Sequence, residues 1–142
     1  MRVLHLAGGP AEVGLGRPAS LYVPAEQRFV PLVCSTVRWM GRSLALSRAQ
    51  LGDLNLVVGE ACGVMLRPDQ TAGPGKVMGC RCRGVDGALQ VSISAHVDRD
   101  AAPDVTGFGW QVLSLLVDDL SWGRDDRNGM IRMHVRPGGD GG

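Results

Sequence analysis

The stretch that decides the fold is Ser47-Arg-Ala-Gln-Leu-Gly-Asp-Leu-Asn-Leu-Val-Val-Gly-Glu-Ala-Cys-Gly-Val-Met65. Its first four residues match a capping box, in which the side chains of Ser47 and Gln50 each accept a hydrogen bond from a backbone amide at a helix start. Apolar residues then recur at helical spacing, and they form one stripe: Leu51, Leu54, Val58, Ala61, Cys62 and Met65. The pattern stops at Arg67-Pro68, because a residue before proline avoids the helical conformation. The stretch therefore predicts an amphipathic helix with one face against a core.

The flanking segments predict a helix and strands around it. A second apolar repeat at helical spacing runs from Phe29 to Leu44, and a short strand is expected before it at Leu21–Val23. Alternating segments at Val77–Arg83 and Leu89–Val97 predict two strands joined by a turn at Asp86-Gly87. Neighbours joined by such a short turn run antiparallel.

The last third of the chain predicts one more helix and a closing strand pair. Apolar residues from Val112 to Leu120 repeat at helical spacing, and strands are expected at Trp122 and at Met130–Val135 around a turn at 125–129. The predicted order is strand-helix-helix-strand-strand-helix-strand-strand. This order indicates an α/β fold, an α+β two-layer sandwich with a mixed, mainly antiparallel sheet and helices on one face.

Length and composition place the chain among single-domain globular proteins. It has 142 residues, of which 44% are hydrophobic and 20% charged. We expect a flexible leader at residues 1–18, one domain at 19–136 and a flexible tail at 137–142. No apolar run approaches the roughly 20 residues that span a bilayer, and the first residues do not resemble a secretory signal. A cytoplasmic protein is therefore expected, and the net charge of +1 predicts neither a nucleic-acid nor a membrane partner.

The four cysteines do not have the spacing of a zinc site. Structural zinc sites usually use C-x₂₋₄-C pairs, whereas the only close pair in this chain is Cys80-x-Cys82. On a strand, these two side chains point to the same face. We expect buried free thiols and no metal site.

Two acidic residues are candidates for chemistry. A turn of 100° per residue places Glu60 opposite the apolar stripe, on the same side of the helix as Val57 and Val64. A carboxylate on such a half-apolar wall can act as a general base, although a lone glutamate on a helix is more commonly a solvated charge. Asp98 follows a predicted strand, where it can accept a hydrogen bond from an exocyclic amine or simply start a turn.

Gly107 and Gly109 precede the third predicted helix. Free amides at a helix start attract phosphate, and glycines allow a ligand to approach closely. The dinucleotide fingerprint G-x-G-x-x-G is not completed, because position 112 is valine. The alternative is a turn before a core helix, in which Phe108 and Trp110 pack against the protein.

In this order, the segments resemble the anti-sigma-factor serine/threonine kinases of the GHKL ATPase superfamily (gyrase, heat-shock chaperone, histidine kinase, MutL). The resemblance covers residues 19–136. The sequence Leu-Asn-Leu-Val-Val-Gly-Glu-Ala-Cys, at 54–62, resembles the N-box helix, and Gly-Phe-Gly-Trp-Gln-Val-Leu, at 107–113, resembles the second glycine box. The resemblance implies that Glu60 is the general base and Asp98 the adenine-binding residue, and that Gly107 and Gly109 cradle the phosphates of ATP.

Two departures from the family pattern concern the same nucleotide. Val64 stands where the family has the asparagine that coordinates Mg²⁺, and an apolar side chain cannot bind a cation that requires oxygen ligands. The first glycine box, D-x-G-x-G in the family, reads Asp-Arg-Asp-Ala-Ala at 98–102. Because Mg²⁺ neutralises charge during phosphoryl transfer, we expect ATP turnover to be weak or lost.

The resemblance also implies the partners. They are a sigma factor or the antagonist protein of an anti-sigma factor, without direct contact to nucleic acid or membrane, and a homodimer is compatible with the family. The alternative is a catalytically inactive protein-interaction module whose nucleotide cleft is occluded.

Overall fold

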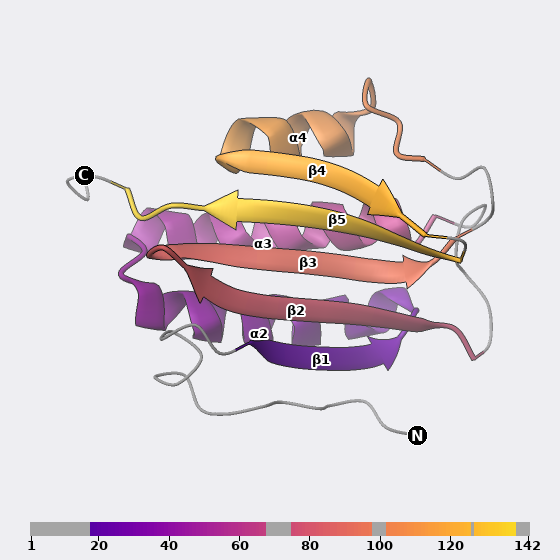
Figure 1. The fold of residues 1–142 in the computed structure, drawn as a ribbon, viewed down its shortest axis with the longest axis horizontal. Helices are drawn as coiled ribbons and strands as arrows, with labels where there is room; N and C mark the ends of the chain where they lie inside the picture. Colours follow the sequence, from indigo (N-terminus) through magenta and orange to yellow (C-terminus); the bar gives the residue numbers. More distant parts are fainter. Residues whose placement is uncertain (1–17, 68–74, 98–101, 126, 139–142) are drawn as a thin grey trace.

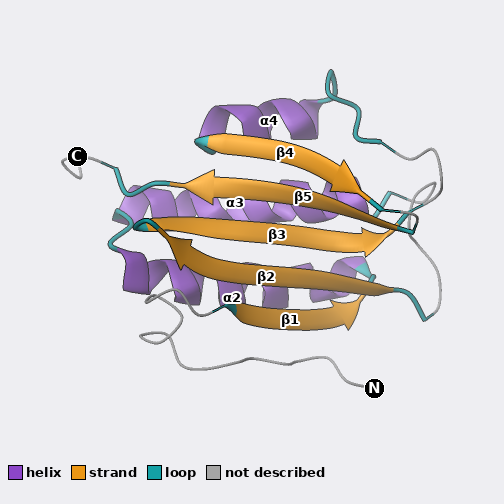
Figure 2. Cartoon of the chain, viewed as in Figure 1, coloured by secondary structure: helices purple, strands orange, loops and turns teal. Residues whose placement is uncertain are grey.

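The computed structural model describes residues 18–67, 75–97, 102–125 and 127–138. In that part of the chain, five strands form one antiparallel sheet in the order β1-β2-β3-β5-β4, and helices pack on one side of it (Figures 1 and 2). The elements are β1 (Ala19–Pro24), α2 (Val30–Gly41), α3 (Arg48–Met65), β2 (Val77–Val85), β3 (Ala88–His96), α4 (Phe108–Leu116), β4 (Asp119–Arg124) and β5 (Asn128–Val135). Short 3₁₀ turns, Gln27–Phe29 and Arg42–Leu44, flank α2.

The predicted two-layer α/β class and the predicted order of elements are confirmed. One detail of the expectation is wrong: every strand pair in the described sheet is antiparallel, so the sheet is not mixed. β5 lies between β3 and β4, and it runs antiparallel to both. Helices α2 and α3 cover one face, and α4 lies beside α3 near β4, at the edge of the sheet (Figure 1).

Strand register builds the core. Leu21, Cys80, Ile93, Ile131 and Trp122 are successive partners across the five strands. The first four are at most 3% exposed. Side chains alternate between the two faces of a sheet. This row and the rows two residues away along each strand therefore face the helices, while the residues between these rows face away.

The predicted capping box at the start of α3 is present. Ser47 Oγ accepts a hydrogen bond from the Gln50 backbone N–H at 3.1 Å, and Gln50 Oε1 accepts one from the Ser47 backbone N–H at 2.9 Å. The same Gln50 side chain reaches the segment after β5, where Nε2 donates to the carbonyl of Arg136 and Oε1 accepts from Gly138 N–H at 2.9 Å. This glutamine therefore joins the start of α3 to the chain that leaves the last strand.

Helix α4 is shorter than the sequence predicts. It ends at Leu116, and Val117 is already extended, with φ −113° and ψ 154°. Leu120, which was expected at the end of this helix, belongs to β4 and pairs with Met133 of β5. Pairing between β4 and β5 thus overrides the helical spacing of the apolar residues.

The cysteine prediction holds for three of the four thiols. Cys62, Cys80 and Cys82 are buried free thiols, whereas Cys34 is only partly buried. The Sγ atoms of Cys80 and Cys82 lie 3.8 Å apart on the helix side of β2. Burial, which disfavours a thiolate, raises the pKa of Cys62 to about 12.

Replacement of one core residue of α3 tests this packing. Leu54 is 1% exposed, so Leu54→Ala leaves a cavity and should lower the free energy of unfolding by about 2–5 kcal/mol. Leu56, on the same helix, is 47% exposed, and Leu56→Ala should change stability by less than about 0.5 kcal/mol. Urea denaturation of both variants measures the difference, and equal losses would contradict the described orientation of α3.

Candidate functional site

The last turns of α3 face the first turn of α4 across an open hollow of about 370 Å³. The α3 side contributes an acidic, an apolar and a basic side chain, and the α4 side contributes an aspartate and the glycine-flanked helix start. The lining residues are Glu60, Gly63, Val64, Arg67, Asp104, Gly107, Phe108, Gly109 and Trp110. Glu60 and the two glycines, which the sequence singles out, therefore line one hollow.

Glu60 lies directly against the backbone of α4. A methyl group on Gly109 would lie 2.9 Å from Glu60 Oε2 and 3.6 Å from Val64 Cγ2. Ordinary contacts of such a methyl group are 3.4 Å or longer, so any side chain at position 109 would displace the carboxylate. Glycine at this position is what allows the carboxylate and the helix to approach so closely.

Packing of α3 fixes the direction of Glu60. Leu54, Val58, Ala61 and Met65 are at most 1% exposed and point towards the sheet and α2. Val57 is 2% exposed, so it belongs to the core and not to the half-apolar wall on which we placed it with Glu60. Glu60 is partly buried at the edge of this core, beside Val64.

A second carboxylate lies beside the start of α4. Asp104 Oδ1 accepts hydrogen bonds from the Thr106 backbone N–H at 3.0 Å and from Thr106 Oγ1 at 2.7 Å. Gly107 N–H donates to the Asp104 carbonyl at 2.9 Å, and a methyl group on Gly107 would lie 3.1 Å from Asp104 Oδ2. Hydrogen bonds from the side chain and then the backbone of Thr106 lower the pKa of Asp104, and the charge of Arg67 adds to this. The Asp104 carboxylate therefore lies near the helix amides at which the sequence places phosphate.

Arg67 and Asp104 were missed in the sequence. Arg67 was interpreted only as the end of a helix, although it follows Glu60 by seven residues, about two helical turns, and so falls on the same side. Asp104 lies in a loop, but Asp-x-Thr is a sequence typical of a turn closed by the aspartate side chain. Together they place one positive and one negative group in the hollow besides Glu60.

Asp98 lies outside the described residues, so its predicted contact with adenine stays a prediction. Val64 does line the hollow, and its side chain presents methyl groups there. Within the described ranges, no three His, Cys, Asp or Glu side chains are grouped so that they could hold a metal ion. Among the residues around the hollow, Val64 offers no oxygen ligand to Mg²⁺, whereas Glu60 and Asp104 carry carboxylates.

The aromatic residues beside the glycines differ in their surroundings. Trp110 is partly buried and packs against the core, as expected. Phe108 is 78% exposed, so the expectation that it packs is wrong. It follows the N-cap residue Gly107 as the first residue of α4, and the first turn of this helix directs its ring to the surface at the mouth of the hollow.

Neither the models of known protein families nor the characterised proteins with which the sequence was compared match this chain. The resemblance to anti-sigma-factor kinases therefore rests on the sequence motifs alone. None of the described helices has the length and apolar character needed to cross a membrane.

The pKa of Asp104 gives a pH-dependent test of the loop that starts α4. A pKa that is lowered on folding stabilises the protein above the unfolded value of about 4, and this contribution is lost as the pH falls through the folded value. Asp104→Asn should therefore be less stable than the wild type at pH 7, and the difference should close below about pH 4. Thermal unfolding between pH 3 and pH 7 measures this, with Thr106→Val as a second variant that removes the hydroxyl donor. A difference in Tm that does not change with pH would show that the Asp104 charge has no role in the turn.

Proposed function

We propose that the chain is a cytoplasmic regulator of the anti-sigma-factor kinase type, which binds a sigma factor or its antagonist protein and has weak or no phosphoryl-transfer activity. The observation that carries this proposal is the contact of the Glu60 carboxylate with the backbone at Gly109. This contact joins the counterpart of the N-box helix to the counterpart of the second glycine box, which is the arrangement that the resemblance implies.

The charges in the hollow support the proposal that phosphoryl transfer is weak or lost. A triphosphate bound at the start of α4 would meet Glu60 and Asp104, with Arg67 as the one basic side chain among the lining residues that the structure describes. Repulsion between like charges is substantial at contact distance near a protein surface, where the effective dielectric constant is well below that of water. Mg²⁺ would offset this repulsion, but Val64 supplies no ligand for it.

The outer side of α4 supports a protein partner. Phe108 and Leu115 are 78% and 84% exposed, and they are spaced by seven residues, so they lie on one side of the helix. Val105, just before the helix, is 55% exposed. Exposed apolar side chains that lie close together commonly mark interaction sites. We call Val105, Phe108 and Leu115 the α4 surface, and we propose that the partner binds there, at the mouth of the hollow.

A second candidate is an interaction module that takes no nucleotide at all. The position of Asp104 favours it, because this carboxylate lies beside Gly107 and is stabilised in its charged form. In this case the hollow binds no nucleotide, and the α4 surface alone accounts for the function.

Restoring the missing ligand should separate the two candidates. We expect wild-type protein to bind Mg-ATP with a Kd of about 1 mM or weaker, and the double variant Val64→Asn/Asp104→Asn to bind at least about tenfold more tightly, a gain of about 1.4 kcal/mol. Leu56→Asn, an exposed change on the same helix, should leave the affinity unchanged. Calorimetric titration measures all three proteins.

Two outcomes of this titration would change the proposal. Micromolar affinity of the wild type would contradict the loss of nucleotide function. No gain in the double variant would contradict a nucleotide site in this hollow and would leave the pure interaction module.

Truncation of the α4 surface tests partner binding. The probes are the purified sigma factors and anti-sigma-factor antagonists of the source organism, titrated separately. Phe108→Ala and Leu115→Ser should each weaken binding by about tenfold or more, because exposed apolar residues at the centre of an interface carry much of its affinity. Val77→Ser, which alters a residue 51% exposed on β2, is the matched control, and Tm should change little in all three variants. Binding by none of these probes, or equal binding by all variants, would refute the assignment.

A further inference from the structure

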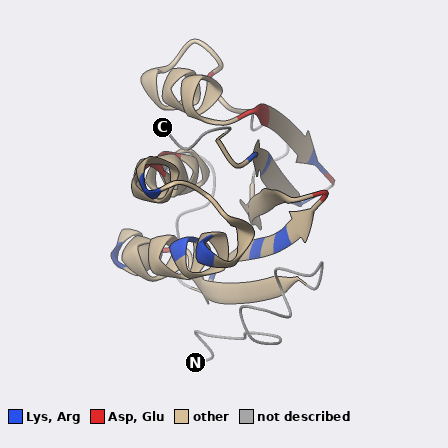
Figure 3. Cartoon of the chain, turned by 90° about the vertical axis from the view of Figure 1, so that its left-hand side faces the viewer, with Lys and Arg blue, Asp and Glu red and all other residues tan. Residues whose placement is uncertain are grey.

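The face of the sheet that points away from the helices carries a row of alternating serine and arginine residues. Ser20, Arg81, Ser92, Arg132 and Ser121 are successive partners across β1, β2, β3, β5 and β4. Each of them lies next to a core residue along its strand, so their side chains project to the opposite, open side of the sheet. Figure 3, viewed from the side, shows the sheet with this face turned away from the helical layer.

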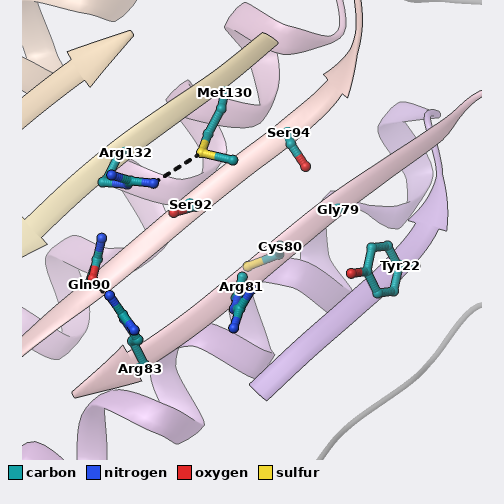
Figure 4. A pocket seen from close by; sticks show the side chains of 10 residues that line it. All are labelled: Tyr22, Gly79, Cys80, Arg81, Arg83, Gln90, Ser92, Ser94, Met130 and Arg132. Carbon is teal, nitrogen blue, oxygen red and sulfur yellow. Dashed lines mark hydrogen bonds between the residues drawn. The ribbon is translucent and has the colours of Figure 1, made fainter. Parts of the chain in front are cut away.

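This row crosses a hollow of about 280 Å³. Small residues form its floor, namely Gly79, Ser92 and Ser94, and larger side chains rise around them (Figure 4). A methyl group on Gly79 would lie 2.9 Å from Ser94 Oγ and 3.2 Å from Tyr22 Cε1, so glycine keeps this part of the floor open beside the tyrosine ring. The hollow therefore exists because small residues lie between larger side chains on neighbouring strands.

The hollow is basic. Arg81 and Arg83 of β2 and Arg132 of β5 line it, and the lining residues that the structure describes include no aspartate or glutamate. Arg83 Nε donates to Gln90 Oε1 at 3.0 Å, and Gln90 is only 8% exposed, so this pair is held in place. Arg132 has a weak acceptor, the Met130 sulfur at 3.7 Å. Within the described ranges, none of these three arginines forms an ion pair with a carboxylate of the chain.

The positions of Arg81 and Arg132 indicate which kind of anion the hollow can bind. They flank β3 from both sides, and because neighbouring strands are about 4.8 Å apart, their Cα atoms are separated by about 10 Å. Both guanidinium groups can therefore reach one anion above Ser92, whose hydroxyl lies between them in the row. A phosphate monoester offers three terminal oxygens and a charge near −2, which suits two guanidinium groups and one hydroxyl, whereas a carboxylate offers only two oxygens.

We propose that this hollow is a binding site for a small phosphate monoester. The phosphate lies over Ser92 between Arg81 and Arg132, and the organic group lies towards Tyr22 and the floor at Gly79. Three arginines line one small hollow in a chain with a net charge of only +1, which favours a compact ligand over a nucleic-acid backbone.

The site is independent of the hollow at Glu60. The two hollows lie on opposite sides of the sheet and share no lining residue. Variants of one hollow can therefore be assayed without altering the other. Failure of the proposed regulator function would not refute this inference, which has its own test.

The test is a calorimetric titration with phenyl phosphate at low ionic strength, with benzoate as the matched ligand that has the ring but no phosphate. We expect wild-type protein to bind phenyl phosphate, and Arg81→Gln and Arg132→Gln each to weaken binding by at least about tenfold, because each removes a charge-assisted bidentate contact. Ser92→Ala should weaken it by a smaller factor. Arg42→Gln, an exposed arginine outside the hollow, is the control and should bind as the wild type does.

Several results would overturn the proposal. These are absence of phenyl phosphate binding by the wild type at about 10 mM ligand, equal affinity for benzoate, or unchanged affinity in both arginine variants. A single-stranded hexanucleotide that binds more tightly than phenyl phosphate, and loses this binding in Arg132→Gln, would also overturn it in favour of nucleic acid. Unchanged thermal unfolding of the variants, which alter exposed side chains, confirms that lost binding is not lost folding.

Discussion

The fixed orientation of α3 is the constraint on which the rest of the structure depends. Its buried stripe packs against the sheet and α2, and its opposite flank contacts α4. Rotation of the helix about its axis would bury Glu60 or expose Leu54, and both changes are costly. The hydrophobic core therefore determines where the Glu60 carboxylate points.

The hollow at Glu60 and the hollow at Arg81 have opposite electrostatic character. In the hollow between α3 and α4, the carboxylates of Glu60 and Asp104 lie near the positive end of a helix, and the protein itself thus supplies negative charge beside the amides of a helix start. On the open sheet face, three arginines line a hollow to which the described residues contribute no carboxylate. An anionic ligand would therefore be favoured on the sheet and disfavoured at the helix start.

Local patterns were sufficient to predict most elements, whereas contacts between distant segments were not. The capping box and the apolar stripe predicted α3, and alternation predicted the long strands, because both signals are read within one segment. The end of α4 at Leu116 was missed because β4 pairs with β5. The placement of Arg67 near Asp104, and of Arg81 and Arg132 on either side of β3, could not be predicted, because a single sequence does not reveal which distant segments become neighbours. Glu60 and Gly109 were brought together only through a family resemblance, which carries such long-range information.

The double use of Gln50 has a consequence for the order in which the protein folds. Its side chain completes the local cap of α3 and also holds Arg136 and Gly138, 86 and 88 residues further along the chain. During synthesis, α3 can form as soon as it leaves the ribosome, but the full set of bonds at its first turn waits for nearly the entire domain to be translated. Contacts of such large sequence separation form late and slow the overall rate. The start of this helix is therefore a place where a local cap is completed by residues from the other end of the domain.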